Sequence, residues 1–305
     1  MISVLICTYN RTDSLRVTLE SLARMSVPLD LAWELIVVDN NSTDDTRAVV
    51  EEFARTSSLN VRYLFEGQQG KSIALNTGVR SAKGEIIAFT DDDVIVHPQW
   101  IADIKATFEK FACLGVAGRI VPVWEHGPKP SWAEMEGPYG FPRVFANFDL
   151  GEEPKLITTD PSGANMAFRK IAFEKYGLFR TDLGLVGSER TKGEETEFAF
   201  RLIKAGERLA YAPGAIVYHP VPQHKMAKSY VLSYYFDYGR TSVLMGGWPE
   251  GAICYFGVPR YMFRSLLENS IKWVTALDRR ARFNYKMKLY LAAGEIVAAR
   301  RLSKS

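Results

Sequence analysis

Residues 86–98 read IIAFTDDDVIVHP, an apolar run typical of a buried strand that ends in three consecutive aspartates. A buried carboxylate is costly unless a partner offsets its charge. Successive residues of an extended chain point in opposite directions, so we expect Asp91 and Asp93 to share one side and Asp92 to face the other. The pattern predicts a divalent cation, Mg²⁺ or Mn²⁺, because both prefer oxygen ligands. The alternative is a solvated acidic turn or a helix cap ahead of Pro98.

Short apolar runs alternate with amphipathic segments over the first ~120 residues, which is the pattern of an α/β domain. This alternation predicts a mainly parallel sheet with helices on both faces. The expected strands cover 3–9, 34–39, 61–65, 85–90 and 115–121, and the expected helices cover 15–22, 44–53, 72–82 and 101–111.

Polar residues follow three of these strands at the point where each one ends. In such sheets ligands bind beyond the carboxyl ends of the strands, so these residues predict a binding site at one edge. Asp39 is expected to accept hydrogen bonds from a nucleobase or a ribose, although an Asx-turn would also explain it. The residues concerned are Thr8, Tyr9, Asn10 and Arg11, then Asp39, Asn40 and Asn41, and then the aspartates 91–93.

The rest of the chain is less regular. Residues 122–160 are rich in Pro, Gly and Trp and read as a long irregular insertion, either a lid or an acceptor loop. Structure is expected to resume at 162–170, followed by a helix over 194–206, two short strands at 208–213 and 215–220, and two or three helices from 227 onward. We expect a cytoplasmic protein, since the three cysteines lack metal-ligand spacing and neither a signal peptide nor a transmembrane helix is indicated.

Residues 279–305 contain eight Lys or Arg and one acid, and carry +7 in a chain whose net charge is +3. A basic segment rich in aromatic and aliphatic residues predicts an anionic partner, in particular peripheral contact with the inner face of a membrane. The alternative is a solvated helix face. No nucleic acid partner is expected.

One motif is misleading. Residues 67–72, GQQGKS, end like a phosphate-binding loop, but position 65 is Phe65 where that loop needs glycine. The motif would also have to follow the first strand rather than the third, so we reject it. Lys71 is expected either to contact a phosphate or to lie on the surface.

Five segments together resemble the family 2 glycosyltransferases with the GT-A fold. The resemblance covers about residues 1–220, and its strength lies in the order and spacing of the motifs. They are SVLICTYNR (3–11) with TLESL (18–22), ELIVVDNNSTDDT (34–46), GKSIALNTGVRSAKGEIIAFTDDDV (70–94), SGANMAFRKIAFEKYGLF (162–179) and EETEFAFRLIKAGERLAYAPGAIVYH (194–219).

This resemblance implies an inverting, metal-dependent transfer from a UDP- or GDP-sugar to a glycan or a lipid-linked acceptor. It implies that Asp91 lies near the ribose or the metal, that Asp93 binds the metal, and that His219 is a further ligand of the same Mn²⁺ or Mg²⁺. The residues implied to bind the nucleotide sugar are Thr8, Tyr9, Asn10, Arg11, Asp39, Asn41, Lys71, Asp91 and Asp92.

The family commonly has Glu-Asp where this chain has Glu194-Glu195, so the general base falls to Glu195. Because glutamate is one methylene longer than aspartate, Glu194 or Glu197 remains an alternative base. Acidic residues also favour a helix N-terminus, which explains them structurally. The SGAN segment (162–165) matches the acceptor-side loop, where Gly163 leaves room for a sugar and Asn165 bonds its hydroxyls.

These features predict a GT-A catalytic domain over 1–226 and a helical region over 227–305. The catalytic domain would divide into a nucleotide-binding half (1–121) and an acceptor half (122–226). Two other functions compete. A sugar-phosphate nucleotidyltransferase would need a glycine-rich loop after the first strand, which CTYNRTDS (7–14) lacks. A non-catalytic carbohydrate-binding protein would not need the acidic cluster.

Overall fold

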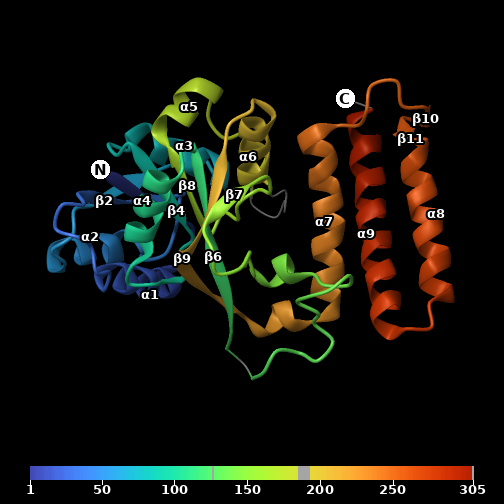
Figure 1. Cartoon of the computed structure of the whole chain (residues 1–305), viewed down its shortest axis with the longest axis horizontal. Coiled ribbons are helices and arrows are strands. Elements are labelled where there is room, and N and C mark those ends of the chain that lie inside the picture. The colour runs from blue at the N-terminus through green and yellow to red at the C-terminus, as the bar shows by residue number, and fades with distance from the viewer. Residues whose placement is uncertain (126, 185–192, 304–305) are drawn as a thin grey trace. The chain divides into compact units, whose positions relative to one another are not determined.

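The computed structural model describes residues 1–125, 127–184 and 193–303. Within them, nine strands form one sheet in the order β3-β2-β1-β4-β8-β6-β9-β5, and β7 pairs with β9 (Figure 1). Four neighbouring strands are parallel, and all but the edge strand β3 are almost wholly buried, as expected for strands covered on both faces. They are β1 (Ile2–Thr8), β2 (Trp33–Asp39), β3 (Val61–Phe65) and β4 (Ile86–Thr90).

The other half of the sheet is antiparallel. β8 (Asn165–Arg169) is reversed beside β4, so its first residue pairs with Thr90, the last residue of β4. β6 (Gly115–Trp124) pairs antiparallel with β8. β9 (Leu209–Val221) pairs with the short strands β5 (Ile95–Val96) and β7 (Lys155–Ile157). The reversal of β8 brings the SGAN segment to the edge of the sheet where the aspartates lie.

The prediction of two short strands over 208–220 is wrong, because β9 is one continuous strand. The dipeptide Pro213-Gly214 resembles a break but is a site of close approach. A Cβ atom on Gly214 would lie 2.8 Å from the carboxyl group of Asp103, so a larger residue would require the Asp103 side chain to move.

Helices cover both faces of the sheet. Side chains of α1 (Thr12–Ala23), α2 (Thr46–Thr56) and α4 (Trp100–Lys110) share one buried apolar cluster with alternate residues of the central strands. α3 (Lys71–Ser81), α5 (Lys170–Tyr176) and α6 (Glu194–Lys204) share a second cluster with the residues in between. This architecture confirms the α/β fold class predicted from the alternating sequence.

The described residues form two compact units, the sheet unit (1–123, 146–182 and 194–220) and a helical unit that includes 124–145 and the residues from 221 onward. The predicted functional division at 226 stays a prediction. The 122–160 insertion contains little regular structure: the 3₁₀ turn Pro142–Phe145 and β7. A second 3₁₀ turn, Gln223–Met226, precedes the helices. In the part of the chain that the structure describes, none of the helices has the length and apolarity needed to span a bilayer.

The helical unit contains α7 (Lys228–Gly246), α8 (Arg260–Thr275) and α9 (Arg279–Leu302), with a small hairpin of β10 (Cys254–Tyr255) and β11 (Val258–Pro259). α9 packs against both α7 and α8 (Figure 1). α7 and α9 approach backbone to backbone at two glycines, since a Cβ on Gly239 would lie 2.1 Å from the carbonyl oxygen of Leu291, and one on Gly294 would lie 2.0 Å from that of Phe236. The basic segment after residue 278 is therefore mostly a packed helix.

Candidate active site

The turn after β1 is tied to the turn after β2. Asn10 has a left-handed backbone (φ 51°), which asparagine tolerates better than most residues. Its backbone N–H donates to Ser42 Oγ (3.0 Å), and its Oδ1 accepts a hydrogen bond from the N–H of Thr43 (2.7 Å). Thr8 is buried at the end of β1 and Tyr9 is exposed. This link fixes the first predicted nucleotide-binding segment at the carboxyl edge of the sheet.

Asp39 is buried and both of its carboxylate oxygens accept hydrogen bonds. Oδ1 accepts from the N–H of Ser42 (2.8 Å), and Oδ2 accepts from the hydroxyl of Tyr63 (2.8 Å). Burial and this carboxylate together raise the pKa of Tyr63. Asn41 follows in the left-handed region (φ 68°). The bond from Ser42 shows that Asp39 stabilises the turn after β2, and its contact with a nucleobase stays a prediction.

Asn40 has a positioning role that the sequence reasoning missed. Its Nδ2 donates to the carbonyl of Gln68 (2.8 Å), and its Oδ1 accepts from the N–H of Gly70 (2.8 Å). Gly70 has a φ of 146°, a conformation that favours glycine, and α3 begins at the next residue, Lys71. Asn40 therefore holds the loop that presents Lys71. Its position directly after β2 is the sequence feature that could have indicated this role.

Lys71 is not a surface lysine. Its side chain is about three-quarters buried, and its Nζ lies 2.9 Å from Asp91 Oδ1. Burial alone would lower the pKa of Lys71, but the carboxylates of Asp91, Glu194 and Glu195 outweigh burial and hold it well above its usual value. Burial likewise acts to raise the pKa of Asp91, but Lys71, His219 and Arg11 together outweigh it and lower that pKa to about 2.

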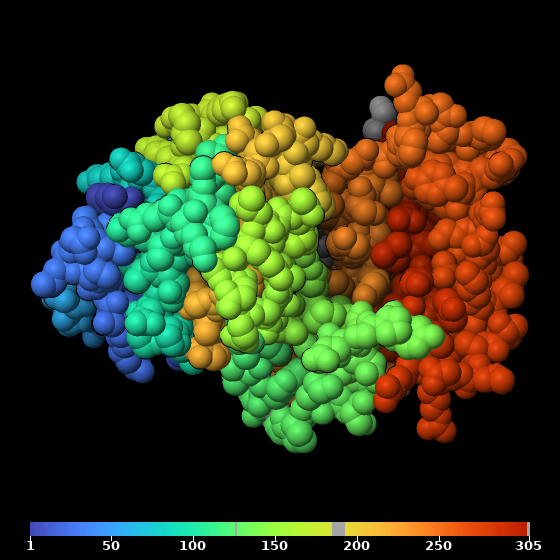
Figure 2. Space-filling view, in the orientation of Figure 1, coloured from blue at the N-terminus to red at the C-terminus, as the bar shows by residue number. Residues whose placement is uncertain are grey.

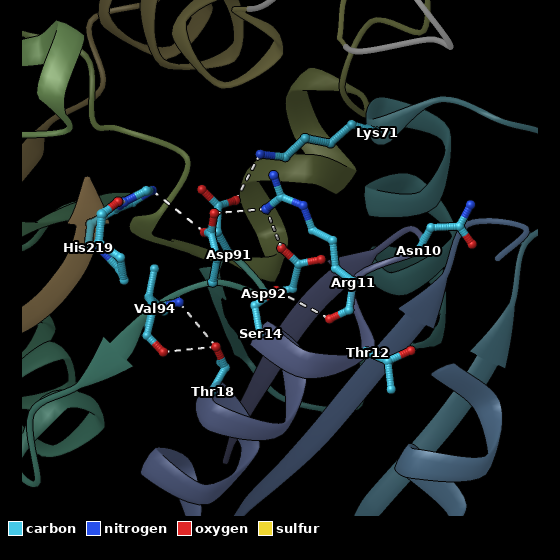
Figure 3. A network of polar contacts seen from close by, with 12 residues as sticks. Asn10, Arg11, Thr12, Ser14, Thr18, Lys71, Asp91, Asp92, Val94 and His219 are labelled. Atoms are coloured by element: carbon cyan, nitrogen blue, oxygen red, sulfur yellow. Dashed lines mark hydrogen bonds and ion pairs between the residues drawn. The ribbon is translucent and has the colours of Figure 1, made fainter. Parts of the chain in front are cut away.

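Arg11 pairs with the other two aspartates, at 3.0 Å from Asp92 Oδ1 and 2.8 Å from Asp93 Oδ2 (Figure 3). Burial nevertheless raises the pKa of Asp92 to about 6. The sequence reasoning assigned the opposing charge to a metal alone. The chain itself supplies two cations, and they come from residues far from the aspartates in sequence.

The segment after the aspartates is fastened to α1. The hydroxyl of Thr18 donates to the carbonyl of Val94 (2.8 Å) and accepts from its N–H (3.1 Å) (Figure 3). Ser21 Oγ accepts from the N–H of Val96 (3.2 Å). The acidic loop is thus held from behind by a helix as well as by its ion pairs.

Asp91, Asp93 and His219 converge, with one ligand atom from each lying within 4.8 Å of the others. His219 Nδ1 lies 2.9 Å from the carbonyl oxygen of Pro220, and its Nε2 lies 3.6 Å from Asp93 Oδ1. Because a carbonyl only accepts, a hydrogen bond to Pro220 requires a proton on Nδ1, and Nε2 is the ring nitrogen that faces a carboxylate oxygen. Two carboxylates and an imidazole nitrogen that converge in this way are a donor set that fits a divalent cation.

Glu195 lies beside Lys71 at the N-terminus of α6. A Cβ on Gly163 would lie 3.2 Å from Glu195 Oε1 and 3.5 Å from Lys71 Nζ, so the three residues meet at one point. Among the described residues, Glu195 Oε2 is buried and has no hydrogen-bond partner. Burial and the neighbouring charge of Glu194 raise the pKa of Glu195 to about 8, although Lys71 opposes them. This is the setting of a carboxyl group that exchanges a proton near neutral pH.

The neighbouring acids of α6 differ from Glu195. Glu197 is paired with Arg201, whose Nε donates to Glu197 Oε1 (3.1 Å), so it is occupied by its own helix. Glu194 is almost fully buried. Thr196 donates to Asp160 Oδ2 (2.7 Å), which fixes the first turn of the helix against the loop before β8.

Asn165 is not at the site, and the expectation that it bonds sugar hydroxyls is not supported by its surroundings. Its side chain is fully buried: Nδ2 donates to the carbonyls of Arg119 (2.8 Å) and Ala215 (2.7 Å), and Oδ1 accepts from the indole N–H of Trp100 (2.8 Å). Both N–H groups of the amide are therefore used within the core, and complete burial keeps the side chain from a ligand. It joins strands β6, β8 and β9.

Comparison with known proteins agrees with this geometry. The model of the family Glycosyl transferase family 2 matches residues 3–177. The succinoglycan biosynthesis protein ExoM of Rhizobium meliloti is 31% identical over 243 residues, which cover 79% of this chain and 73% of that protein. Glycosyltransferase AglE of Haloferax volcanii is 36% identical over 220 residues, covering 72% of this chain and 66% of its own.

A solved structure, a mannosyltransferase from Pyrobaculum calidifontis in complex with GDP-Man and Mn²⁺, has the same fold. It superposes with a TM-score of 0.59 at 20% identity and covers 98% of this chain and 73% of its own.

Proposed function

Because this chain belongs to glycosyl transferase family 2, we propose that it transfers a sugar, with inversion, from a nucleotide diphosphate sugar to a hydroxyl of a glycan or lipid-linked acceptor. Membership of the family makes the chain a glycosyltransferase of polysaccharide or glycoconjugate biosynthesis. The observation that carries the finer proposal is the cluster of Asp91, Asp93 and His219, which Lys71 links to Glu195, whose buried Oε2 has no hydrogen-bond partner among the described residues.

On the donor side, Thr8, Tyr9, Asn10 and Arg11 are proposed to hold the base and ribose of a UDP- or GDP-sugar. Asp39 and Asn41, from the neighbouring turn, would complete this pocket. Lys71 would contact the diphosphate, and its pairing with Asp91 supports this role because it places an ammonium group beside the acidic cluster. Asp92 acts through Arg11 by keeping the guanidinium at this edge.

Asp91, Asp93 and His219 would hold Mn²⁺ or Mg²⁺. A cation at this place supplies positive charge to the diphosphate as it leaves. His219 is kept in the right tautomer by the carbonyl of Pro220, which leaves Nε2 free as a ligand atom.

On the acceptor side, Glu195 is proposed to take the proton from the attacking hydroxyl. Its Oε2 is already desolvated, and its raised pKa makes the carboxylate a stronger base than an ordinary glutamate. A Cβ atom on Gly163 would lie only 3.2 Å from Glu195 Oε1, so the glycine is proposed to keep this carboxylate open to the acceptor. Glu194 is the alternative base.

The proposal is tested by screening nucleotide sugars with Mn²⁺ for binding by thermal shift, and then for transfer to glycan and lipid-linked acceptors. Asp93→Ala should lose metal-dependent transfer and weaken nucleotide diphosphate binding. Glu195→Gln should lose transfer, by about 10²- to 10⁴-fold, while it keeps donor binding. The same change at Glu194 and Glu197 serves as a comparison. Near-wild-type turnover of Glu195→Gln would show that the base lies elsewhere.

Peripheral contact of the helical unit with a membrane is also proposed, because a lipid-linked acceptor would be met at a bilayer surface. The basic residues of α9 support this contact.

A further inference from the structure

The outer face of α8 exposes aliphatic side chains in a regular stripe. Leu267, Ile271 and Val274 are 62%, 54% and 67% exposed. They are spaced by four and three residues, so they lie on one side of the helix. Leu277, in the turn that follows, is fully exposed. Soluble proteins rarely expose large contiguous apolar surfaces, and where such a surface occurs it commonly marks an interaction site.

The opposite side of α8 is already used. Met262 is buried in a cluster with α9 residues, and α8 packs against α9 and β11 rather than against α7. Figure 1 shows α9 between the other two helices, and in Figure 2 the side chains of α8 form the outer surface of the helical unit. Within the described residues, nothing covers the stripe.

The hairpin before α8 adds exposed aromatic groups. Tyr255 and Phe256 are 49% and 90% exposed, and Ile253 is 60% exposed. Phe256 adopts a left-handed backbone (φ 53°) in the tight turn between β10 and β11, an unfavourable conformation for a bulky residue. The turn therefore presents an aromatic side chain to solvent at a conformational cost.

The charges of this region decide between possible occupants. Arg260 and Arg264 continue the α8 stripe toward its N-terminus at the same spacing, whereas Lys272 Nζ lies over the ring of Tyr285 on α9. α8 contains these three basic residues and one acid, Glu268, which pairs with Arg264. A second copy of the same face would carry the same net positive charge and would be repelled. A layer of lipid phosphates has the complementary charge, and an apolar stripe with aromatic and basic neighbours is the pattern of an interfacial helix.

We propose that the outer face of α8 and the β10–β11 turn bind the surface of an anionic lipid bilayer. Leu267, Ile271 and Val274 enter the boundary between headgroups and acyl chains, and Arg260 and Arg264 contact phosphates. The inference rests on the proposed membrane contact and assigns it to α8 rather than to the basic α9.

The test uses the full chain with point substitutions, because α9 is the packing partner of both α7 and α8 and its removal would disrupt the unit. The variant is Leu267→Ser/Ile271→Ser/Val274→Ser. A matched control is Leu29→Ser/Ile171→Ser/Val17→Ser, which removes the same three side chains from exposed positions of the sheet unit. Binding is measured by co-sedimentation with phosphatidylglycerol-rich vesicles and with pure phosphatidylcholine vesicles.

The wild type and the control should bind phosphatidylglycerol vesicles equally, with weaker binding at high salt and to phosphatidylcholine. The α8 variant should bind about 100-fold more weakly while its circular dichroism is unchanged. Equal binding by all three proteins, or no vesicle binding by the wild type, would overturn the inference. The inference would also be overturned if the wild type were a dimer in size-exclusion chromatography and the α8 variant a monomer. The α8 face would then bind a second copy of the chain. Donor binding in solution is measured in parallel, so that loss of vesicle binding with intact donor binding separates this inference from the proposed transfer.

Discussion

The pH dependence of transfer is the sharpest test of the proposed base. Glu195 has a pKa of about 8 because of burial and Glu194, and it can accept a proton only in its charged form. A carboxyl group is neutral below its pKa and charged above it, so kcat/KM should rise with pH. From about pH 7 to about pH 9 the charged fraction grows from about one tenth to about nine tenths, which predicts a rise of about tenfold.

Two substitutions should move the midpoint of this profile in opposite directions. Glu194→Gln removes a like charge and should lower the midpoint. Lys71→Met removes an opposite charge and should raise it. Lys71 Nζ and Glu195 Oε1 both lie close to the same point, at most about 6.7 Å apart. At an effective dielectric constant of about 20 their attraction is about 2.5 kcal/mol, so the midpoint should move upward by one to two pH units, roughly.

The assay is release of the nucleoside diphosphate at saturating Mn²⁺, with kcat/KM followed across the pH range. Midpoints are compared rather than rates, because Lys71 is also expected to contact the diphosphate. The reasoning is refuted if both variants keep the wild-type midpoint, or if both shift it in the same direction. If Glu195→Gln kept the pH dependence of kcat/KM, the reasoning would likewise be refuted.

Three stability predictions are independent of activity and are measured by urea denaturation. Arg11→Met removes the partner of two aspartates and should cost about 1–2 kcal/mol, whereas Arg24→Met, which breaks an exposed pair, should cost less than about 0.5 kcal/mol. Asn165→Asp turns an oxygen toward two backbone carbonyls and should cost about 3 kcal/mol, and a change in donor KM without this loss would restore the residue to the sugar site. Gly294→Ala should cost about 1–3 kcal/mol through its clash with α7, while Gly246→Ala, with open space around it, should be neutral or slightly stabilising; equal effects would contradict the close helix contact.

The sequence was sufficient for the parallel half of the sheet because its signals are local. Apolar runs such as 34–39 and 86–90 mark strands, and the polar residues after them mark the edge where the site lies. Asp91 and Asp93 share a cluster with His219, but the expected separation of Asp92 from Asp93 is wrong, because residues 92 and 93 lie in a turn and one nitrogen of Arg11 contacts both carboxylates.

The parts that sequence reasoning missed depend on residues far apart in the chain. The pair of Arg11 with Asp92 joins positions separated by 81 residues, and no local pattern indicates which basic residue will meet which acid. Asn165 was misplaced for the same reason. Its segment resembles an acceptor loop, but the side chain turns into the core toward carbonyls of β6 and β9.

The order of the three C-terminal helices has a consequence for synthesis of the protein. α7 and α8 leave the ribosome before α9, yet each of them packs on α9 rather than on the other. The side of α7 around Gly239 and the buried side of α8 therefore have no packing partner in the nascent chain until α9 has been translated. A chaperone that binds exposed apolar segments can therefore bind α7 and α8 during this interval, when the strands of the sheet have already been translated.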